Sequence, residues 1–208
     1  MTIPTMNALF RYFETLFTLN QKLLALCGAN VFYQMQEQEK LIDEVIINIP
    51  RLVPYGYNYK TGMYKIIKSD GLMKFSDDIS FLSGDYERIL QDHNDFLIKV
   101  IKIRHKLEHE IDNARIVESG SSPSSLFSVT YVVDDIERKI CSRELIAFVK
   151  DLNILFSKIQ ETIKCFAYEN PCVNHQYYWR LTRYDYSDFN KIFESDMLHI
   201  IGKAMLSF

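Results

Sequence analysis

The sequence predicts a mainly α-helical fold, a helical bundle into which one small β-hairpin is inserted. Only seven glycines and five prolines occur among 208 residues, and 48% of the residues are hydrophobic. Such a composition suits long helices around a core better than many short strands. Apolar residues also recur at steps of three and four over long segments, which is typical of amphipathic helices. Residues 126–133 depart from this spacing and predict a strand.

The N-terminal part of the chain predicts two helices and then an irregular segment. Six apolar residues follow the helical period between residues 5 and 26: Leu9, Phe13, Leu16, Leu19, Leu23 and Leu26. A second, less regular helix ends near Ile49, because the residue before Pro50 avoids helical geometry. Residues 50–79 combine proline, glycine and asparagine with tyrosines and lysines, so we expect no regular structure there.

A long helix is predicted to begin near Ser83. Ser83 suits the N-cap, and Asp85 in the first turn would meet the positive end of the helix dipole. Five apolar residues continue the core stripe of this helix: Leu90, Leu97, Val100, Leu107 and Ile111. Residues 119–125, SGSSPSS, then predict a flexible linker.

One hairpin is predicted at about residues 126–141. Residues 126–133 are rich in β-branched and aromatic side chains, Asp134 and Asp135 suit a turn, and residues 136–142 suit a second strand. A hairpin alone is marginally stable. We therefore expect it to lie against helices or against a second copy of the chain.

The last two predicted helices cover residues 143–169, capped by Ser142, and about residues 187–206. Seven apolar residues of the first alternate steps of four and three: Leu145, Val149, Leu152, Phe156, Ile159, Ile163 and Phe166. This spacing suits a bundle helix or a helix that pairs with a second subunit. We expect residues 1–79 to pack on a helical core formed by residues 80–208, within one compact domain.

Composition limits the classes of function and the compartment. The formal net charge of −3 gives no broad attraction to nucleic acid, so any RNA contact needs a local basic patch. Four scattered cysteines suggest neither a zinc ribbon nor a disulfide framework. Arg11 and Glu14 interrupt the first apolar stretch, which argues against a signal peptide. No segment approaches the roughly 20 apolar residues of a membrane span. We expect a cytoplasmic protein that makes no membrane contact.

The segment RHKLEHE, residues 104–110, carries the most chemistry. One interpretation is a zinc-dependent hydrolase, because H-x-x-E-H places His105 and His109 on one helical face with Glu108 as the base for bound water. Such a site needs a third protein ligand. Three downstream glutamates could be chosen as this ligand only because they are acidic: Glu161, Glu169 and Glu194.

The same letters also form R-x4-H, with Arg104, His109 and a polar residue, His105, directly after the arginine. This pattern resembles the HEPN superfamily (higher eukaryotes and prokaryotes nucleotide-binding domain), small helical bundles with an R-x4-6-H motif. The resemblance covers the motif and its surrounding helices, about residues 80–170. It implies a HEPN-like bundle that cleaves RNA without metal or other cofactor. It also implies a homodimer that joins two motifs, of the toxin–antitoxin or phage-defence type.

A second R-x4-H occurs at Arg88 and His93. Arg88 is followed by apolar Ile89 early in a predicted helix, whereas Arg104 is followed by His105 near a helix end. We therefore assign the catalytic motif to Arg104 and His109. We interpret His93 as a core histidine with a polar partner.

The residue types of the preferred motif suit phosphodiester chemistry. A histidine can act as base or acid near neutral pH, and a guanidinium binds phosphate oxygens in a bidentate manner. On a straight helix, however, five positions separate Arg104 and His109 by about 140°. Either the helix breaks between them, or a second motif completes the site in a homodimer, for which residues 143–169 offer one surface.

Other residues of the segment have supporting interpretations. His105 is interpreted as support for the site, with a solvent-facing side chain as the alternative. Glu108 and Glu110 are interpreted as solvated partners of Lys106, Arg104 or cations of a neighbouring subunit. Lys106, Arg180 and Arg183 are weaker candidates for RNA contact. Partners implied by the resemblance are RNA, a second copy and an antitoxin or other protein. A HEPN-like module that binds RNA, a nucleotide or a protein without catalysis remains the alternative, as does a charged helix end without chemistry.

Overall fold

The computed structural model describes residues 3–28, 35–53, 80–109, 115–122, 125–169 and 185–194. The helices are α1 (Ile3–Gly28), α2 (Met35–Asn48), the 3₁₀ turn η1 (Ile49–Arg51), α5 (Ser80–Asp92), α6 (Asn94–His109), α7 (Ser142–Glu169) and α9 (Tyr186–Glu194). The strands are β1 (Arg115–Ser122), β2 (Ser125–Val133) and β3 (Ile136–Cys141). Within these ranges, no helix is long and apolar enough to cross a lipid bilayer.

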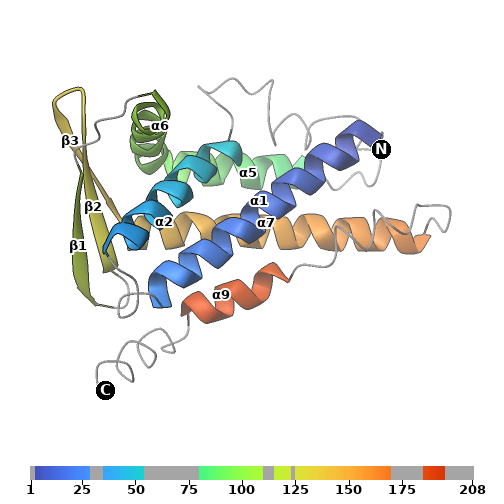
Figure 1. The fold of residues 1–208 in the computed structure, drawn as a ribbon. Coiled ribbons are helices and arrows are strands. Elements are labelled where there is room, and N and C mark those ends of the chain that lie inside the picture. Colours follow the sequence, from blue (N-terminus) through green and yellow to red (C-terminus); the bar gives the residue numbers. More distant parts are fainter. Residues whose placement is uncertain are drawn as a thin grey trace, which may run out of the picture.

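The long helix α7 lies at the centre of the fold, and α1, α5 and α9 pack along it (Figure 1). The sheet stands at one end of the bundle, and α6 packs on α2, η1 and the strands β2 and β3. The mainly α-helical fold with a small β insertion is therefore confirmed. Most of the predicted segment 50–79 lies outside the described residues, although Pro50 and Arg51 belong to η1.

The heptad stripe of α7 faces the core of its own chain. Five of its predicted residues are at most 1% exposed: Leu145, Val149, Leu152, Phe156 and Ile159. Ile163 and Phe166 are among the side chains that the structure does not describe. Because these five residues are covered within one chain, they offer no surface to a second subunit. The alternative, a bundle helix, is confirmed.

The stripe predicted for the first helix meets α7 through aromatic rings. Phe13 of α1 lies 4.9 Å from Phe156 of α7 and 5.6 Å from Tyr186 of α9, measured between ring centroids. The Tyr186 hydroxyl donates a hydrogen bond to the Phe13 carbonyl oxygen at 2.6 Å. These three buried rings fasten three helices that are far apart in the sequence.

A ladder of three asparagines crosses the same helices. Asn20 of α1 and Asn153 of α7 are both fully buried and exchange two amide hydrogen bonds of 2.8 Å. Asn153 also donates to the Asn190 side chain of α9 at 2.9 Å, and Asn190 donates to the Lys150 carbonyl at 3.1 Å. Each buried amide thus has partners, as a low-dielectric interior requires.

The predicted hairpin is present, but it belongs to a three-stranded antiparallel sheet of order β1-β2-β3. Asp134 and Asp135 have φ angles of 55° and 59°, and Val133 pairs with Ile136 across them. Two central residues with positive φ match the twist that a two-residue hairpin needs. The linker prediction at 119–125 is wrong, because residues 119–122 lie in β1 and Ser125 in β2. Backbone pairing with β2 orders this Ser/Gly-rich segment despite its composition.

The helix predicted from Ser83 is two helices. The first, α5, begins at Ser80, so Ser83 is not its N-cap, and the chain turns at His93 before α6. Leu90, Leu97 and Val100 of the predicted stripe are buried, whereas Ile111 is outside the described residues. The periodicity survives the turn because two hydrogen bonds of helical spacing flank it, from the amide of His93 and from that of Leu97.

The start of α7 is capped by Glu144 and not by Ser142. The Glu144 carboxylate accepts a hydrogen bond from the Cys141 amide at 3.1 Å, whereas the Ser142 hydroxyl accepts one from the Phe127 amide of β2 at 3.4 Å. Ser142 thus ties the helix to the sheet, and the third residue of the helix satisfies the first free amide.

Candidate functional site

The candidate site lies on the last two turns of α6, whose opposite face is built into the core. Four apolar residues of that face are buried: Phe96, Leu97, Val100 and Ile103. The Lys99 ammonium lies 2.5 Å from a Glu144 carboxylate oxygen and 3.1 Å from the Lys139 carbonyl oxygen. The middle of α6 is therefore anchored to β3 and to the start of α7.

The helix continues without a break through His109. Arg104 and Glu108 form an ion pair, with Nε 3.0 Å from Oε1. One position further along the helix, the rings of His105 and His109 meet at 4.8 Å between centroids, inclined by 60°. The predicted Arg104–Glu108 pair is confirmed. The suggestion that the helix breaks within the motif is wrong.

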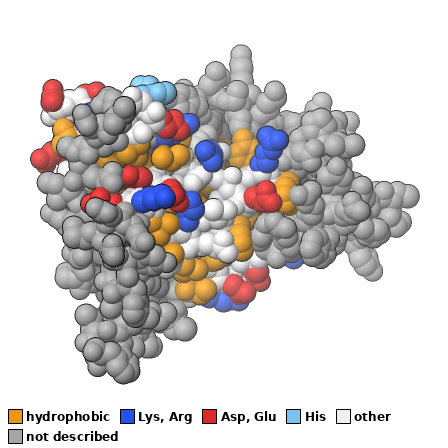
Figure 2. Space-filling model, viewed as in Figure 1, with side chains coloured by type: hydrophobic (Ala, Val, Ile, Leu, Met, Phe, Trp, Pro, Cys, Tyr) orange, Lys and Arg blue, Asp and Glu red, His pale blue; other side chains and the backbone are white. Residues whose placement is uncertain are grey.

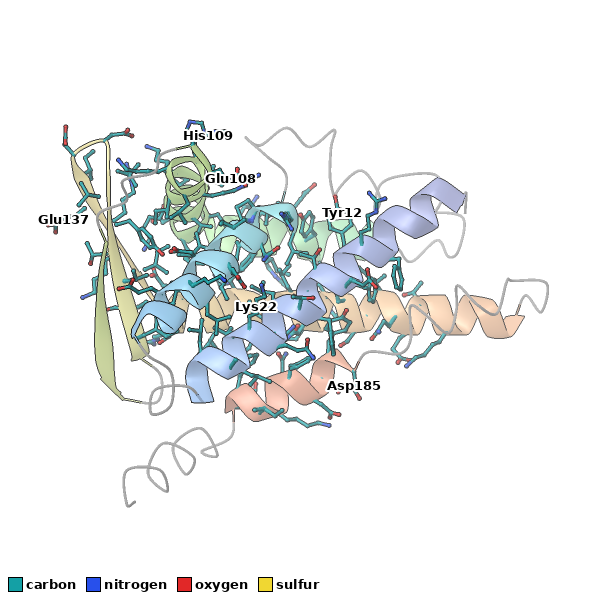
Figure 3. The ribbon with its side chains drawn as sticks, in the orientation of Figure 1. Tyr12, Lys22, Glu108, His109, Glu137 and Asp185 are labelled. Carbon is teal, nitrogen blue, oxygen red and sulfur yellow. The ribbon has the colours of Figure 1, made fainter. Side chains whose placement is uncertain are left out.

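The motif thus forms two neighbouring rows on the helix surface. The Arg104 side chain is 22% exposed, whereas His105 and His109 are exposed. His109 points away from the bundle at the end of α6, with Glu108 beside it (Figure 3). Histidine side chains mark the surface above this helix end in the space-filling view (Figure 2). Two imidazoles are open to a ligand, and a neighbouring carboxylate already orients the guanidinium.

The other predicted contact residues are not gathered here. Lys106 lies on α6 and is half-buried, and Arg180 and Arg183 are outside the described residues. One residue that no sequence pattern indicated is Asp151, the partner of His93. No spacing rule could have found it, because 58 positions separate the two residues.

The zinc interpretation finds no third ligand among the described residues. No group of three histidine, cysteine, aspartate or glutamate side chains within them could hold a metal ion. Glu161 pairs with Lys164 at 2.8 Å, and Glu194 pairs with Lys150 at 2.8 Å. The Glu169 side chain lies outside the described set.

The second R-x4-H has a different environment. Arg88 pairs with Asp85 at 3.1 Å, and His93 is 13% exposed with its Nε2 atom 2.7 Å from an Asp151 carboxylate oxygen. Asp85, Arg88 and Asp151 line a cavity of about 110 Å³ between α5 and α7. Lys158 also lines it and forms an ion pair with Asp85 at 2.5 Å. His93 is thus the partnered histidine that we predicted, and its Nε2 atom contacts Asp151 of α7.

No model of a known protein family, no curated protein and no solved structure matches the chain.

Proposed function

We propose that this chain is a HEPN-like, metal-independent ribonuclease that acts as a homodimer. One observation carries the proposal: an unbroken helix presents two exposed imidazoles in contact, beside a guanidinium that a carboxylate orients. Arg104 and His109 are the catalytic residues, and His105 supports His109 through their ring contact. The toxin or phage-defence role, the cytoplasmic location and an antitoxin partner belong to the same proposal.

The chemistry needs a base, an acid and a cation. A neutral imidazole accepts the proton of the ribose 2′-hydroxyl, and the 2′-oxygen attacks phosphorus. A protonated imidazole then donates its proton to the departing 5′-oxygen. The guanidinium of Arg104 binds the phosphate oxygens on which negative charge accumulates. His109 supplies one of the two imidazoles.

A second copy supplies what one motif lacks. Arg104 and His109 point about 140° apart on a straight helix, and α6 has no break that would bring them together. If two helices approach across a twofold axis, the arginine row of one copy can face the histidine row of the other. Each site then takes its guanidinium from one copy and its imidazoles from the other, and neither motif is complete alone.

The test is cleavage of a labelled single-stranded RNA by the purified protein, with and without EDTA. We expect chelator-resistant cleavage by the wild type and a loss of about 1,000-fold in rate for His109→Ala, as for removal of an acid or base. Arg104→Ala should lose a similar factor. Arg88→Ala is the matched control, since it removes the arginine of the other R-x4-H and should keep wild-type activity.

The outcomes separate the alternatives. Cleavage that EDTA abolishes would point to a metal-dependent hydrolase using His105, Glu108 and His109. A folded wild type that binds RNA, nucleotide or a protein but cuts nothing would be the non-catalytic module. Equal losses in Arg88→Ala and Arg104→Ala would contradict our choice of motif.

A further inference from the structure

The corner between α5 and α6 is fastened to α7 by one histidine. The Nε2 atom of His93 lies 2.7 Å from Oδ2 of Asp151. The His93 ring also meets the ring of Phe148 edge-on, at 5.4 Å between centroids and 76° between planes. Phe148 in turn contacts Phe96 in the first turn of α6 at 5.7 Å. The corner is thus held to α7 by a polar contact and by edge-on and tilted contacts between rings.

The backbone at this corner bends without losing its connection. The His93 amide donates to the Ile89 carbonyl at 3.1 Å, and the Leu97 amide donates to the His93 carbonyl at 2.9 Å. Figure 1 shows α5 and α6 running in different directions on either side of this turn. At this bend, the side chain of His93 reaches across to Asp151 of α7.

The length of α6 makes its direction important for its far end. The helix has 16 residues, about 24 Å at a rise of 1.5 Å per residue, so a rotation of about 10° at the corner moves the far end by about 4 Å. Lys99 and the buried face hold the middle of the helix. Arg104 and His109 follow Ile103, the last fully buried residue of this helix, and Leu107 between them is partly buried against the core. A displacement of about 1 Å at reacting groups can lower a rate about 100-fold.

We propose that His93 and Asp151 are positioning residues for the RNA-cleaving site. They fix the direction of α6 and thereby the place of Arg104 and His109 in the homodimer. This inference rests on the proposed function. It also gives the second R-x4-H a physical role, since its histidine holds the helix that carries the first.

Two similar amides can test the hydrogen bond to Asp151. In His93→Gln the side-chain amide reaches the place of the imidazole Nε2 and can still donate to Asp151. In His93→Asn the shorter side chain places its amide nearer to the position of Nδ1 and loses that donor. Circular dichroism would confirm that both variants are folded.

The first measurement is the distance between α6 and α7, by electron paramagnetic resonance of two spin labels. Lys102 and Ile154 are exposed and suit the labels. Genetically encoded keto residues would carry them, because the chain has four cysteines. We expect the distance distribution of His93→Asn to shift or broaden, and that of His93→Gln to match the wild type. An unchanged distribution in His93→Asn would overturn the inference.

The second measurement is the kinetics of RNA cleavage. We expect His93→Asn and Asp151→Ala each to lower kcat by about tenfold with little change in KM, since misplacement affects the chemical step more than binding. The double variant should be no slower than either single variant, because both remove one contact. His93→Gln should recover most of kcat. Failure of that recovery would contradict the role of the hydrogen bond.

The two measurements also separate this inference from the proposed function. If the wild type cleaves RNA and kcat is unchanged in His93→Asn, the positioning role fails while the nuclease proposal stands. If the wild type cleaves no RNA, the nuclease proposal and the catalytic half of the inference fail together. The label distance then decides whether His93 directs α6.

Discussion

The two R-x4-H segments have the same spacing and opposite surroundings. Arg88 lies in α5 and His93 at the turn that follows this helix, and each has an aspartate partner. Arg104 and His109 lie on one unbroken helix, where His109 is exposed. Spacing therefore selects candidates, whereas the surroundings of each histidine indicate whether it stabilises the fold or is exposed to a ligand.

Mixing two inactive variants would test whether the motif of Arg104 and His109 is shared between copies. Arg104→Ala and His109→Ala should each be inactive alone. If each site takes its arginine from one copy and its histidine from the other, mixing the two variants after unfolding and refolding restores one intact site in half of the dimers. The mixture should regain about a quarter of wild-type activity. RNA cleavage measures this directly, and an inactive mixture would contradict a site with that division of residues.

The next effect should distinguish the motifs by stability. His93→Ala removes a hydrogen bond and an aromatic contact near the core, so we expect the free energy of unfolding to fall by about 1–3 kcal/mol. His109→Ala changes an exposed side chain and should alter it by less than about 0.5 kcal/mol. Urea titrations followed by circular dichroism would give both values. Equal losses of unfolding free energy in the two variants would contradict this difference between the motifs.

The ion pair between Lys99 and Glu144, which anchors the middle of α6, should weaken in acid. Burial raises the pKa of Glu144, but the hydrogen bonds from Lys99 and from the Cys141 amide outweigh burial and hold the pKa below the ordinary value of 4.5. A carboxylate with a lowered folded pKa stabilises the fold above pH 4.5, and this contribution is lost as the pH falls through the folded pKa.

We therefore expect the free energy of unfolding to fall further for the wild type than for Glu144→Gln when the pH is lowered from 6 to below about 4.5. Urea midpoints measured over this interval would show the difference. Parallel pH profiles for the two proteins would show that the anchor does not depend on the charge of Glu144.

The smallest effect concerns the ion pair beside the candidate base. Arg104 and Glu108 form a surface pair of i,i+4 spacing, which contributes about 0.3–0.5 kcal/mol in such a setting. Glu108→Gln should therefore leave the melting temperature nearly unchanged, while RNA cleavage continues. A loss of activity as large as that of His109→Ala would give Glu108 a catalytic role and revive the interpretation based on H-x-x-E-H.

Local patterns predicted much of the fold. The stripes of α1 and α7, the Asp134–Asp135 turn and the Arg104–Glu108 pair all depend on neighbours within a few residues, so spacing was sufficient. The partner of His93 is Asp151, which is 58 positions away, so no local pattern could indicate it. The strand β1 depends on pairing with β2, and its serines and glycine gave no strand signal. The arrangement of the homodimer that we propose depends on surfaces and not on periodicity, so no spacing in the sequence could predict it.

The asparagine ladder has a consequence for how the helices align. A slip of α7 along α1 by one turn, about 5.4 Å, would let the leucine and phenylalanine side chains find new neighbours of the same kind. Asn153 would then leave the amides of both Asn20 and Asn190, and the two buried amides, Asn20 and Asn153, would lose these hydrogen bonds inside the protein. Apolar contacts allow many axial positions of the helices, whereas the hydrogen bonds between the three amides allow one.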